Sequence, residues 1–427
     1  MKFQFEKLGA LEKKTEIELG DLTIFCGANN TGKTYTSRAI YGFLKTWENH
    51  IDFKIAEGKI QSLLENGVLK IDLRALEKTL PKVLDELSQK YTAFLPTFFR
   101  ASENFFSQTK FQALLSDYQP NYQTALQRSA GTETKNVLNS FKDKDSTVLE
   151  IILLAEDKNL IPHQKVIKHF INKSLGQALL GDYFAPPFLI TSERMGISLF
   201  YRALELNQYA HPVRDDIDFV REIVEVHSRK KSPLIKAHPE LAKLLKKIVG
   251  GEYQVENDQI LFSSQKGHKT DLIPLYLGSA TVASQVELNF YLKCLAKKGD
   301  ILLIDEPEQY LHPANQRKMA RLFVRLIKAG VKVFVTTQSD YLIKELNNLI
   351  ILGNGFEDKQ EIMKKYRYTE QDVLEPTWVK AYIAEKQTLV PAPINEMGIA
   401  VSSFDYEIHE MSDMFDDMTM TMEIAYE

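Results

Sequence analysis

The segment at residues 22–46 constrains the fold more than any other part of the chain. It opens with an apolar run at 22–26, as expected for a strand buried on both faces, and a helical pattern follows from residue 33. Between them lie eight residues: Gly27, Ala28, Asn29, Asn30, Thr31, Gly32, Lys33 and Thr34. A strand, a glycine-containing loop and a helix in this order predict a phosphate-binding loop.

The residue types of this loop suit the chemistry of phosphate. Gly27 and Gly32 permit a tight turn whose successive N–H groups point at an anion, and the helix N-terminus adds its dipole. Lys33 is predicted to reach the β- and γ-phosphates of a nucleotide, and the Thr34 hydroxyl to ligate Mg²⁺. We assign Tyr35, the next residue, to the same nucleotide site. The alternative is a glycine turn beside a surface lysine, which the strand–loop–helix context disfavours.

A second motif supplies carboxylates. Four apolar residues at 301–304 predict a buried strand, and Asp305 and Glu306 follow at its carboxyl end. We expect Asp305 to hold Mg²⁺ through water and Glu306 to polarise the attacking water as general base. A strand that ends in a solvated acidic pair is the alternative. With the phosphate loop, these residues predict ATP and Mg²⁺ as cofactors.

The wider pattern predicts an α/β fold. A helical pattern at 314–329 separates the apolar runs at 301–304 and 331–335, which indicates a parallel core with helical crossovers, and short alternating strands precede residue 22. Apolar positions at 47–185 recur at helical spacing, and we predict a mostly helical insertion there. The expected parts are 1–46 and 186–350 (the two halves of one nucleotide-binding domain), 47–185 (the insertion) and 351–427 (a C-terminal extension).

Composition excludes several classes of protein. Apolar residues make up 44% of the 427 residues, enough for a sizeable core. The balance of 53 basic against 57 acidic residues does not require a nucleic acid partner. Two distant cysteines predict no disulfide framework and a reducing compartment. With no apolar run of about 18 residues, we expect no membrane partner and a cytoplasmic location.

The two motifs together resemble a known family. The loop at 27–34 and the segment Asp-Glu-Pro-Glu-Gln-Tyr-Leu-His-Pro at 305–313 are similar to those of ABC-type ATPases of the SMC/RecF/OLD lineage, which are AAA family ATP-binding proteins. The segment at 336–350 looks like that of ATPase subunits in the anti-phage systems PARIS and Septu. The resemblance covers 1–45 and 185–350 and implies an ABC-type P-loop NTPase head.

The resemblance also implies a composite site. Two heads form a head-to-head dimer that sandwiches two ATP molecules, and a higher homo-oligomer is expected. Ser279, followed by Ala280 and Thr281, matches the signature loop, which contacts the γ-phosphate of the partner's nucleotide in trans. The family usually continues this signature with Ser-Gly or Gly-Gly, so Ala280 and Thr281 depart from the pattern. The segment between Glu306 and Pro313 matches the loop that crosses the dimer seam.

The position of the family's switch histidine holds Gln338 in this chain. A glutamine amide hydrogen-bonds a γ-phosphate but carries neither a proton nor a positive charge at neutral pH. We therefore assign Gln338 and Glu306 to the catalytic step and expect tight ATP binding with slow hydrolysis.

The leading functional hypothesis is an oligomeric sensor and scaffold in anti-phage defence. It would control an effector nuclease of TOPRIM or HNH type in trans and respond to a phage protein or DNA. The acidic residues after Ile350 contain no Asp-x-Asp pair of the TOPRIM kind, so the nuclease is not expected in this chain. A RecF/Rad50-like DNA-repair ATPase that acts on DNA ends is the alternative. The insertion and the Asn-Asn-Thr loop argue against a third class, transporter nucleotide-binding subunits.

Three further features leave alternatives open. The basic stretch at 229–247 fits either a DNA-facing surface or a solvated helix. The acidic, methionine-rich tail from residue 403 fits either a partner-binding segment or a solvated helix. Glu193 and Arg194 follow a predicted strand, and one of them is expected near the nucleotide.

Overall fold

The computed structural model describes residues 1–115, 118–131, 135–154, 161–204, 213–225, 231–265, 272–400 and 410–421. The chain divides into two compact units. The insertion unit contains Met1–Leu8 and Arg38–Pro187, and the head unit contains Gly9–Ser37 and Phe188–Glu427.

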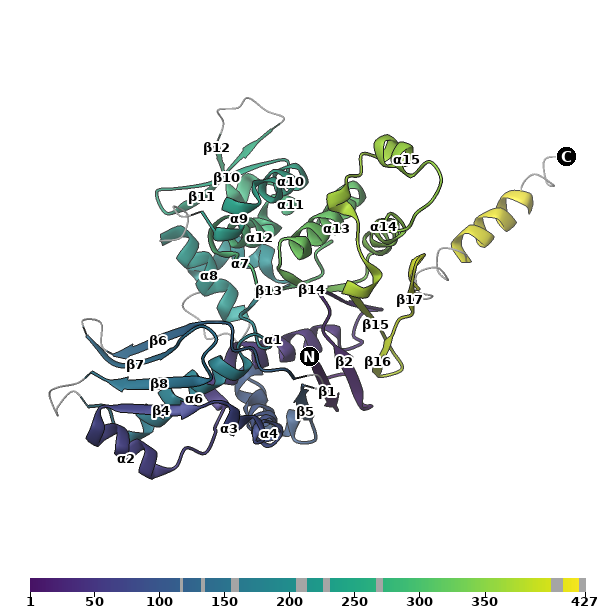
Figure 1. The fold of residues 1–427 in the computed structure, drawn as a ribbon. Coiled ribbons are helices and arrows are strands. Elements are labelled where there is room, and N and C mark those ends of the chain that lie inside the picture. Colours follow the sequence, from purple (N-terminus) through teal and green to yellow (C-terminus); the bar gives the residue numbers. More distant parts are fainter. Residues whose placement is uncertain are drawn as a thin grey trace. The chain divides into compact units, whose positions relative to one another are not determined.

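A six-stranded mixed sheet organises the head unit (Figure 1). Its strands, in spatial order, are β16 (Thr388–Pro391), β15 (Val379–Glu385), β3 (Leu22–Cys26), β14 (Lys332–Thr337), β13 (Ile301–Asp305) and β9 (Pro187–Ile190). Strands β3 and β13 are buried along their whole length, which matches the continuous apolar runs of their sequences. The predicted α/β fold with a parallel core is confirmed.

The direction of the central strands brings the sequence motifs together. Strand β14 pairs in parallel with both β13 and β3, and β15 pairs in parallel with β3. Asp305 lies opposite Thr336, and Thr337 lies opposite Cys26. The carboxyl ends of these strands therefore meet at one edge of the sheet, which is where open α/β sheets bind their ligands.

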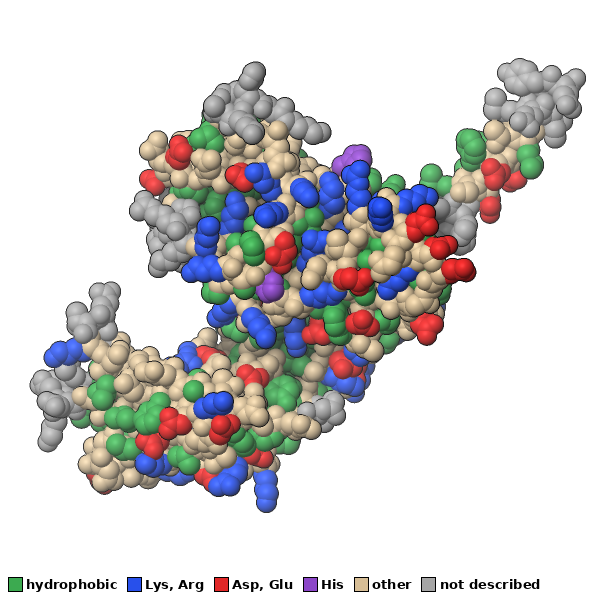
Figure 2. Space-filling model, turned by 45° about the horizontal axis from the view of Figure 1, so that its top comes forward, with side chains coloured by type: hydrophobic (Ala, Val, Ile, Leu, Met, Phe, Trp, Pro, Cys, Tyr) green, Lys and Arg blue, Asp and Glu red, His purple; other side chains and the backbone are tan. Residues whose placement is uncertain are grey.

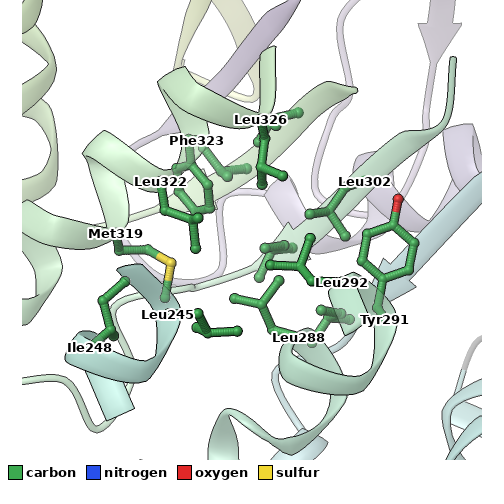
Figure 3. Close-up of a cluster of buried hydrophobic side chains, with 14 of the residues drawn as sticks. Leu245, Ile248, Leu288, Tyr291, Leu292, Leu302, Met319, Leu322, Phe323 and Leu326 are labelled. Atoms are coloured by element: carbon green, nitrogen blue, oxygen red, sulfur yellow. The ribbon is translucent and has the colours of Figure 1, made fainter. Parts of the chain in front are cut away.

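The head unit also contains further helices and strands. They are β2 (Thr15–Glu18), α7 (Arg194–Leu204), α8 (Val213–Glu225), α9 (Pro233–Ala237), α10 (Pro239–Val249), β10 (Gly251–Glu256), β11 (Gln259–Ser264), β12 (Leu272–Pro274), η3 (Leu275–Leu277), α11 (Ala280–Ser284), α12 (Val286–Phe290), η4 (Tyr291–Leu295), α13 (Pro313–Lys328), α14 (Asp340–Ile351), α15 (Lys359–Tyr366), η5 (Glu370–Asp372), η6 (Pro376–Trp378), β17 (Ile394–Asn395) and β18 (Gly398–Ile399). Figure 3 shows where the core forms: Leu245 of α10, Leu288 of α12 and Phe323 of α13 pack towards Leu302 of β13.

Ion pairs also hold helix α13 against helix α14. The Glu345 carboxylate on α14 is fully buried, and it accepts hydrogen bonds from Arg317 and Arg321 of α13 at 2.7 Å each. Pairing of this kind offsets the desolvation cost of a buried carboxylate. The pair of arginines fixes α13 against α14, and with it the segment that leads from β13 into α13.

The insertion unit is mixed rather than mostly helical, so that part of our prediction is wrong. A four-stranded antiparallel sheet in the order β4–β8–β7–β6 accompanies its helices. In β4, Leu69 and Ile71 are buried and alternate with exposed Lys70, a period of two that we had attributed to a helix. The elements of the insertion unit are β1 (Lys2–Glu6), α2 (Glu57–Asn66), β4 (Val68–Asp72), α3 (Arg74–Glu77), α4 (Leu80–Phe99), α5 (Glu103–Phe106), β5 (Lys110–Leu114), β6 (Leu126–Gly131), β7 (Asn136–Lys142), β8 (Val148–Leu153) and α6 (Gln164–Leu180). Helix α1 (Lys33–His50) begins in the head unit and ends in the insertion unit.

The head sheet continues past the boundary that we predicted at residue 350. Strand β15 lies beside β3, so residues 379–385 belong to the sheet that carries the phosphate loop. Beyond them, residues 410–421 form a helix on which Met411, Met414 and Phe415 are exposed. The rest of the acidic tail, at 401–409 and 422–427, lies outside the described residues. No helix in the described part of the chain is long and apolar enough to cross a membrane.

Candidate nucleotide-binding site

The predicted phosphate loop joins β3 to α1 and needs its glycines. Gly27 and Gly32 have φ values of +135° and +94°, which residues with a Cβ atom rarely adopt. A Cβ atom on Gly27 would also lie 2.8 Å from the carbonyl oxygen of Ala384 on β15. Asn30 has a φ of +61°, a conformation that asparagine tolerates better than most residues. Ala28 and Asn29 are exposed at the tip of the loop.

Lys33 lies beneath this loop, with 5% of the residue exposed. Its Nζ donates hydrogen bonds to the carbonyl oxygens of Gly27 at 2.7 Å and Ala28 at 2.6 Å. Burial lowers the pKa of Lys33, while Glu306 is first among the neighbouring groups that raise it. The ammonium group is therefore held inside the loop, where an incoming phosphate can replace a carbonyl as its partner.

Ser37 connects Asp305, one of the two residues predicted to hold Mg²⁺, to the backbone of the other, Thr34. Asp305 Oδ1 accepts hydrogen bonds from the hydroxyls of Ser37 at 3.0 Å and Thr336 at 3.1 Å. The Ser37 hydroxyl also lies 3.0 Å from the carbonyl oxygen of Thr34. A threonine hydroxyl and a carboxylate are oxygen donors of the kind that Mg²⁺ prefers, so this donor set fits the ion. We did not predict Ser37, although its spacing of three from Thr34 puts both on one face of α1.

Glu306 and Gln338 contact each other, as their assignment to one catalytic step requires. Gln338 Nε2 lies 2.7 Å from Glu306 Oε1 and 2.6 Å from Asn29 Oδ1 of the phosphate loop. Gln309 Nε2 donates to the other carboxylate oxygen, Glu306 Oε2, at 2.5 Å. Gln338 thus connects the loop to the predicted general base.

Glu308 is a site residue that our sequence analysis missed. Its Oε1 accepts hydrogen bonds from the hydroxyl of Thr337 at 2.9 Å and from the backbone N–H of Gln338 at 2.7 Å. Burial raises the pKa of Glu308. The carboxyl group therefore fixes the backbone on which Gln338 is mounted. Its place two residues after Glu306 in the same motif was the available signal.

Arg194 supports the backbone of the acidic motif. It is 2% exposed, and its Nη1 donates to the carbonyl oxygens of Asp305 at 2.8 Å and Thr191 at 3.0 Å, while its Nη2 donates to that of Glu306 at 2.7 Å. Burial lowers the pKa of Arg194. Glu193 beside it is exposed. Arg194 therefore lies next to the site through the main chain of Asp305 and Glu306.

The predicted signature residues lie at the start of α11. Ser279 and Ala280 are exposed, and Ser279 Oγ accepts the N–H of Val282 as the helix cap. The Thr281 hydroxyl donates to the carbonyl oxygen of Tyr310, in the segment that follows Glu306. The hydrogen bonds of this chain thus attach the signature segment to the segment after β13, and they attach Gln338 to the phosphate loop.

The basic stretch at 229–247 is not one helix. Arg229 and Lys230 lie outside the described residues, and the rest of the stretch forms α9 and α10. Lys246 pairs with Glu252 at 2.6 Å, while Lys243 and Lys247 are exposed. Figure 2 shows Lys and Arg side chains spread over one face of the molecule with Asp and Glu among them. Both alternatives for this stretch stay open.

Comparison with known proteins gives one family. A family model described as the AAA ATPase domain matches residues 7–343. No curated protein matches the chain.

Solved structures of SMC heads are similar at low scores. An SMC head bound to the C-winged helix domain of ScpA has 13% identity and a TM-score of 0.34, with coverage of 81% of this chain and 90% of that one. The SMC head domain from Thermotoga maritima has 11% identity and a TM-score of 0.33 (92% and 98% coverage). An Smc head with an extended coiled coil, bound to the C-terminal domain of ScpA and derived from Pyrococcus furiosus, has 11% identity and a TM-score of 0.33 (96% and 98% coverage).

Proposed function

We propose that this chain, which belongs to the AAA ATPase domain family, binds ATP with Mg²⁺ and hydrolyses it slowly in a composite site that a second copy completes. One observation carries the proposal. Gln338 connects Asn29 of the phosphate loop to Glu306, at the sheet edge where Lys33 and Asp305 also lie. The groups that bind phosphate, hold a metal and activate water are thus neighbours.

Each of these groups has a chemical task in the proposed reaction. The loop N–H groups and Lys33 bind the phosphates, and the helix N-terminus of α1 adds its dipole. Thr34 and Asp305 would hold Mg²⁺. When bound, this ion neutralises part of the negative charge of the phosphates. Glu306 accepts a proton from the attacking water, and Arg194 keeps the backbone of Glu306 in place.

Exposed tyrosines support completion of the site by a second copy. Tyr35 of the phosphate-loop helix, Tyr276 before the signature, Tyr310 after Glu306 and Tyr341 after Gln338 are 40%, 72%, 49% and 53% exposed. Tyrosine is enriched where protein surfaces meet, and each of these four flanks one of the site segments. A symmetric dimer uses the same patch on both copies, so each copy would contribute a phosphate loop to one site and a signature segment to the other.

Mixing of two inactive variants tests the composite site. Lys33→Ala disables the phosphate loop, and Ser279→Arg blocks the signature, so each homodimer should lack ATPase activity. A mixed dimer contains one intact loop that faces one intact signature, and we expect partial activity to return on mixing. As a control, each variant is mixed with itself at the same total concentration. Failure of the mixture to gain activity, with mixed dimers seen by native mass spectrometry, would contradict the composite site.

The expected rate of ATP hydrolysis depends on Gln338. Because its amide cannot carry a proton or positive charge, stabilisation of the charge that develops on the γ-phosphate is weaker than with histidine. We expect the turnover of the wild-type chain to lie well below about 10 s⁻¹, a typical enzyme median. Gln338→His should raise it, as measured by phosphate release at saturating ATP. A wild-type rate near the median would rule out the slow hydrolysis that we propose.

For the biological role, we propose an oligomeric sensor and scaffold that controls an effector nuclease in trans during phage defence. The resemblance of the segments at 305–313 and 336–350 to anti-phage ATPases supports this role. Its first test is the neighbouring genes, where a TOPRIM or HNH nuclease is expected. Its second is a plaque assay, in which both genes together should protect cells and either alone should not. Sensitivity of gene-deleted cells to DNA damage, without any effect on phage, would favour the DNA-repair alternative.

A further inference from the structure

The turn between Glu306 and Leu311 is strained at both ends. Glu306 and Tyr310 have φ values of +47° and +61°, although neither is glycine. Backbone hydrogen bonds from the N–H of Gln309 to the carbonyl of Glu306 (3.1 Å) and from that of Leu311 to Glu308 (2.9 Å) close the turn. Non-glycine residues persist in this conformation only when surrounding contacts hold them, and such strain is common in segments that switch.

Gln309 is the side chain of this turn that reaches the catalytic carboxylate. Its Nε2 donates to Glu306 Oε2 at 2.5 Å, while Gln338 donates to Oε1 at 2.7 Å. The Gln309 Oε1 is buried without a hydrogen-bond partner among the described residues. An amide donor on each oxygen fixes the plane of the carboxylate, so a change in its orientation breaks one of these bonds. Nothing among the described residues fixes the other end of the Gln309 amide, whereas the backbone N–H of Gln338 is held by Glu308.

The same turn contacts the signature segment and is open to a second copy. The carbonyl oxygen of Tyr310 accepts a hydrogen bond from the Thr281 hydroxyl, two residues after Ser279. The Tyr310 residue itself is 49% exposed. A molecule that docks on Tyr310 or on the signature segment therefore contacts this turn directly. Gln309, the residue before Tyr310, is the one that hydrogen-bonds Glu306.

We propose that Gln309 is a latch that holds Glu306 in an inactive orientation in the single chain and releases it when a second copy docks on the turn at 306–311. This inference rests on the proposed function, since it assumes that Glu306 activates water and that two copies meet at this face. Gln309 is a positioning residue, because it acts on the reaction through Glu306. Glu308 of the same turn accepts hydrogen bonds from Thr337 and from the N–H of Gln338, so the release concerns the side chain of Gln309 and leaves the Glu308 contacts in place.

The test measures ATPase turnover per chain against protein concentration, from dilutions at which native mass spectrometry finds single chains to those at which it finds dimers. For the wild type we expect turnover per chain to rise steeply with protein concentration. Gln309→Ala should raise the rate of the dilute chain by about 2- to 10-fold, the factor that one net hydrogen bond represents, and should lower the ratio of the dimer rate to the single-chain rate by the same factor. Gln309→Met, which keeps the length of the side chain without a donor, should do the same.

A matched control is Gln89→Ala, which removes a glutamine–carboxylate hydrogen bond to Asp85 far along the chain, in the insertion unit. It should leave the concentration profile unchanged. If both Gln309 variants keep the wild-type profile, or lose activity at every concentration, the latch is wrong although the proposed function stands. If the wild-type chain binds no ATP in an equilibrium binding assay, the proposed function itself fails. These two failures are therefore distinguishable.

Discussion

Lys33→Ala is expected to weaken ATP binding by roughly 10- to 100-fold or more. The Lys33 ammonium is the cation inside the phosphate loop, and its two carbonyl partners at 2.6–2.7 Å fix it there before nucleotide arrives. A charge-assisted hydrogen bond contributes about 1.5–3 kcal/mol, so the loss of one contact to phosphate weakens binding by roughly 10- to 100-fold. Loss of the positive charge beside Glu306 and Asp305 adds repulsion of the anionic ligand.

Equilibrium binding of a fluorescent ATP analogue measures this effect. Lys332→Ala is the matched control, because Lys332 is an exposed lysine on β14 in the same sheet, and this variant should bind as the wild type does. The melting temperature of Lys33→Ala must stay close to that of the wild type for a loss of binding to count. A folded Lys33→Ala chain with wild-type affinity would show that the loop at 27–34 is not the nucleotide site.

The parts of the fold that the sequence predicted are those with one dominant local signal. The near-continuous apolar runs of β3, β13 and β14 are typical of strands buried on both faces, and they predicted these strands directly. The glycines of the phosphate loop also predicted its conformation, because positive φ values and close backbone approach require that residue type. The strands of the insertion were missed because period-two alternation over five residues, as in β4, resembles part of a helical pattern.

Contacts that depend on tertiary structure were not predicted, even where the residue itself, such as Arg194, was expected near the nucleotide. Arg194 and Asp305 are separated by 111 positions in sequence, and their hydrogen bond exists because β9 and β13 are neighbours in the sheet. Glu308 holds Gln338 in the same way, across two strand ends. No local sequence pattern predicts such pairs, since each partner alone is an ordinary polar residue. The chemistry of Lys33 and Glu306 was predictable from their motifs, and the groups that orient them were not.

Glu306→Gln is expected to slow hydrolysis by about 10²- to 10⁴-fold while ATP binding persists, because a positioned general base contributes on that order and an amide cannot accept the proton. The phosphate loop and Asp305 are untouched by this change, so bound ATP should accumulate and the dimer should persist. Single-turnover kinetics and native mass spectrometry with ATP measure the two effects separately.

Glu308→Gln distinguishes the base from its neighbour. Both of its hydrogen bonds go to Oε1, and the glutamine oxygen can still accept them from Thr337 and from the N–H of Gln338. We therefore expect a far smaller loss of rate and no accumulation of an ATP-bound dimer. If Glu308→Gln abolished turnover and Glu306→Gln did not, the base would be Glu308. If wild type and Glu306→Gln dimerise equally at every time point after ATP is added, hydrolysis does not reset the complex, and occupancy of the site by ATP is the signal instead.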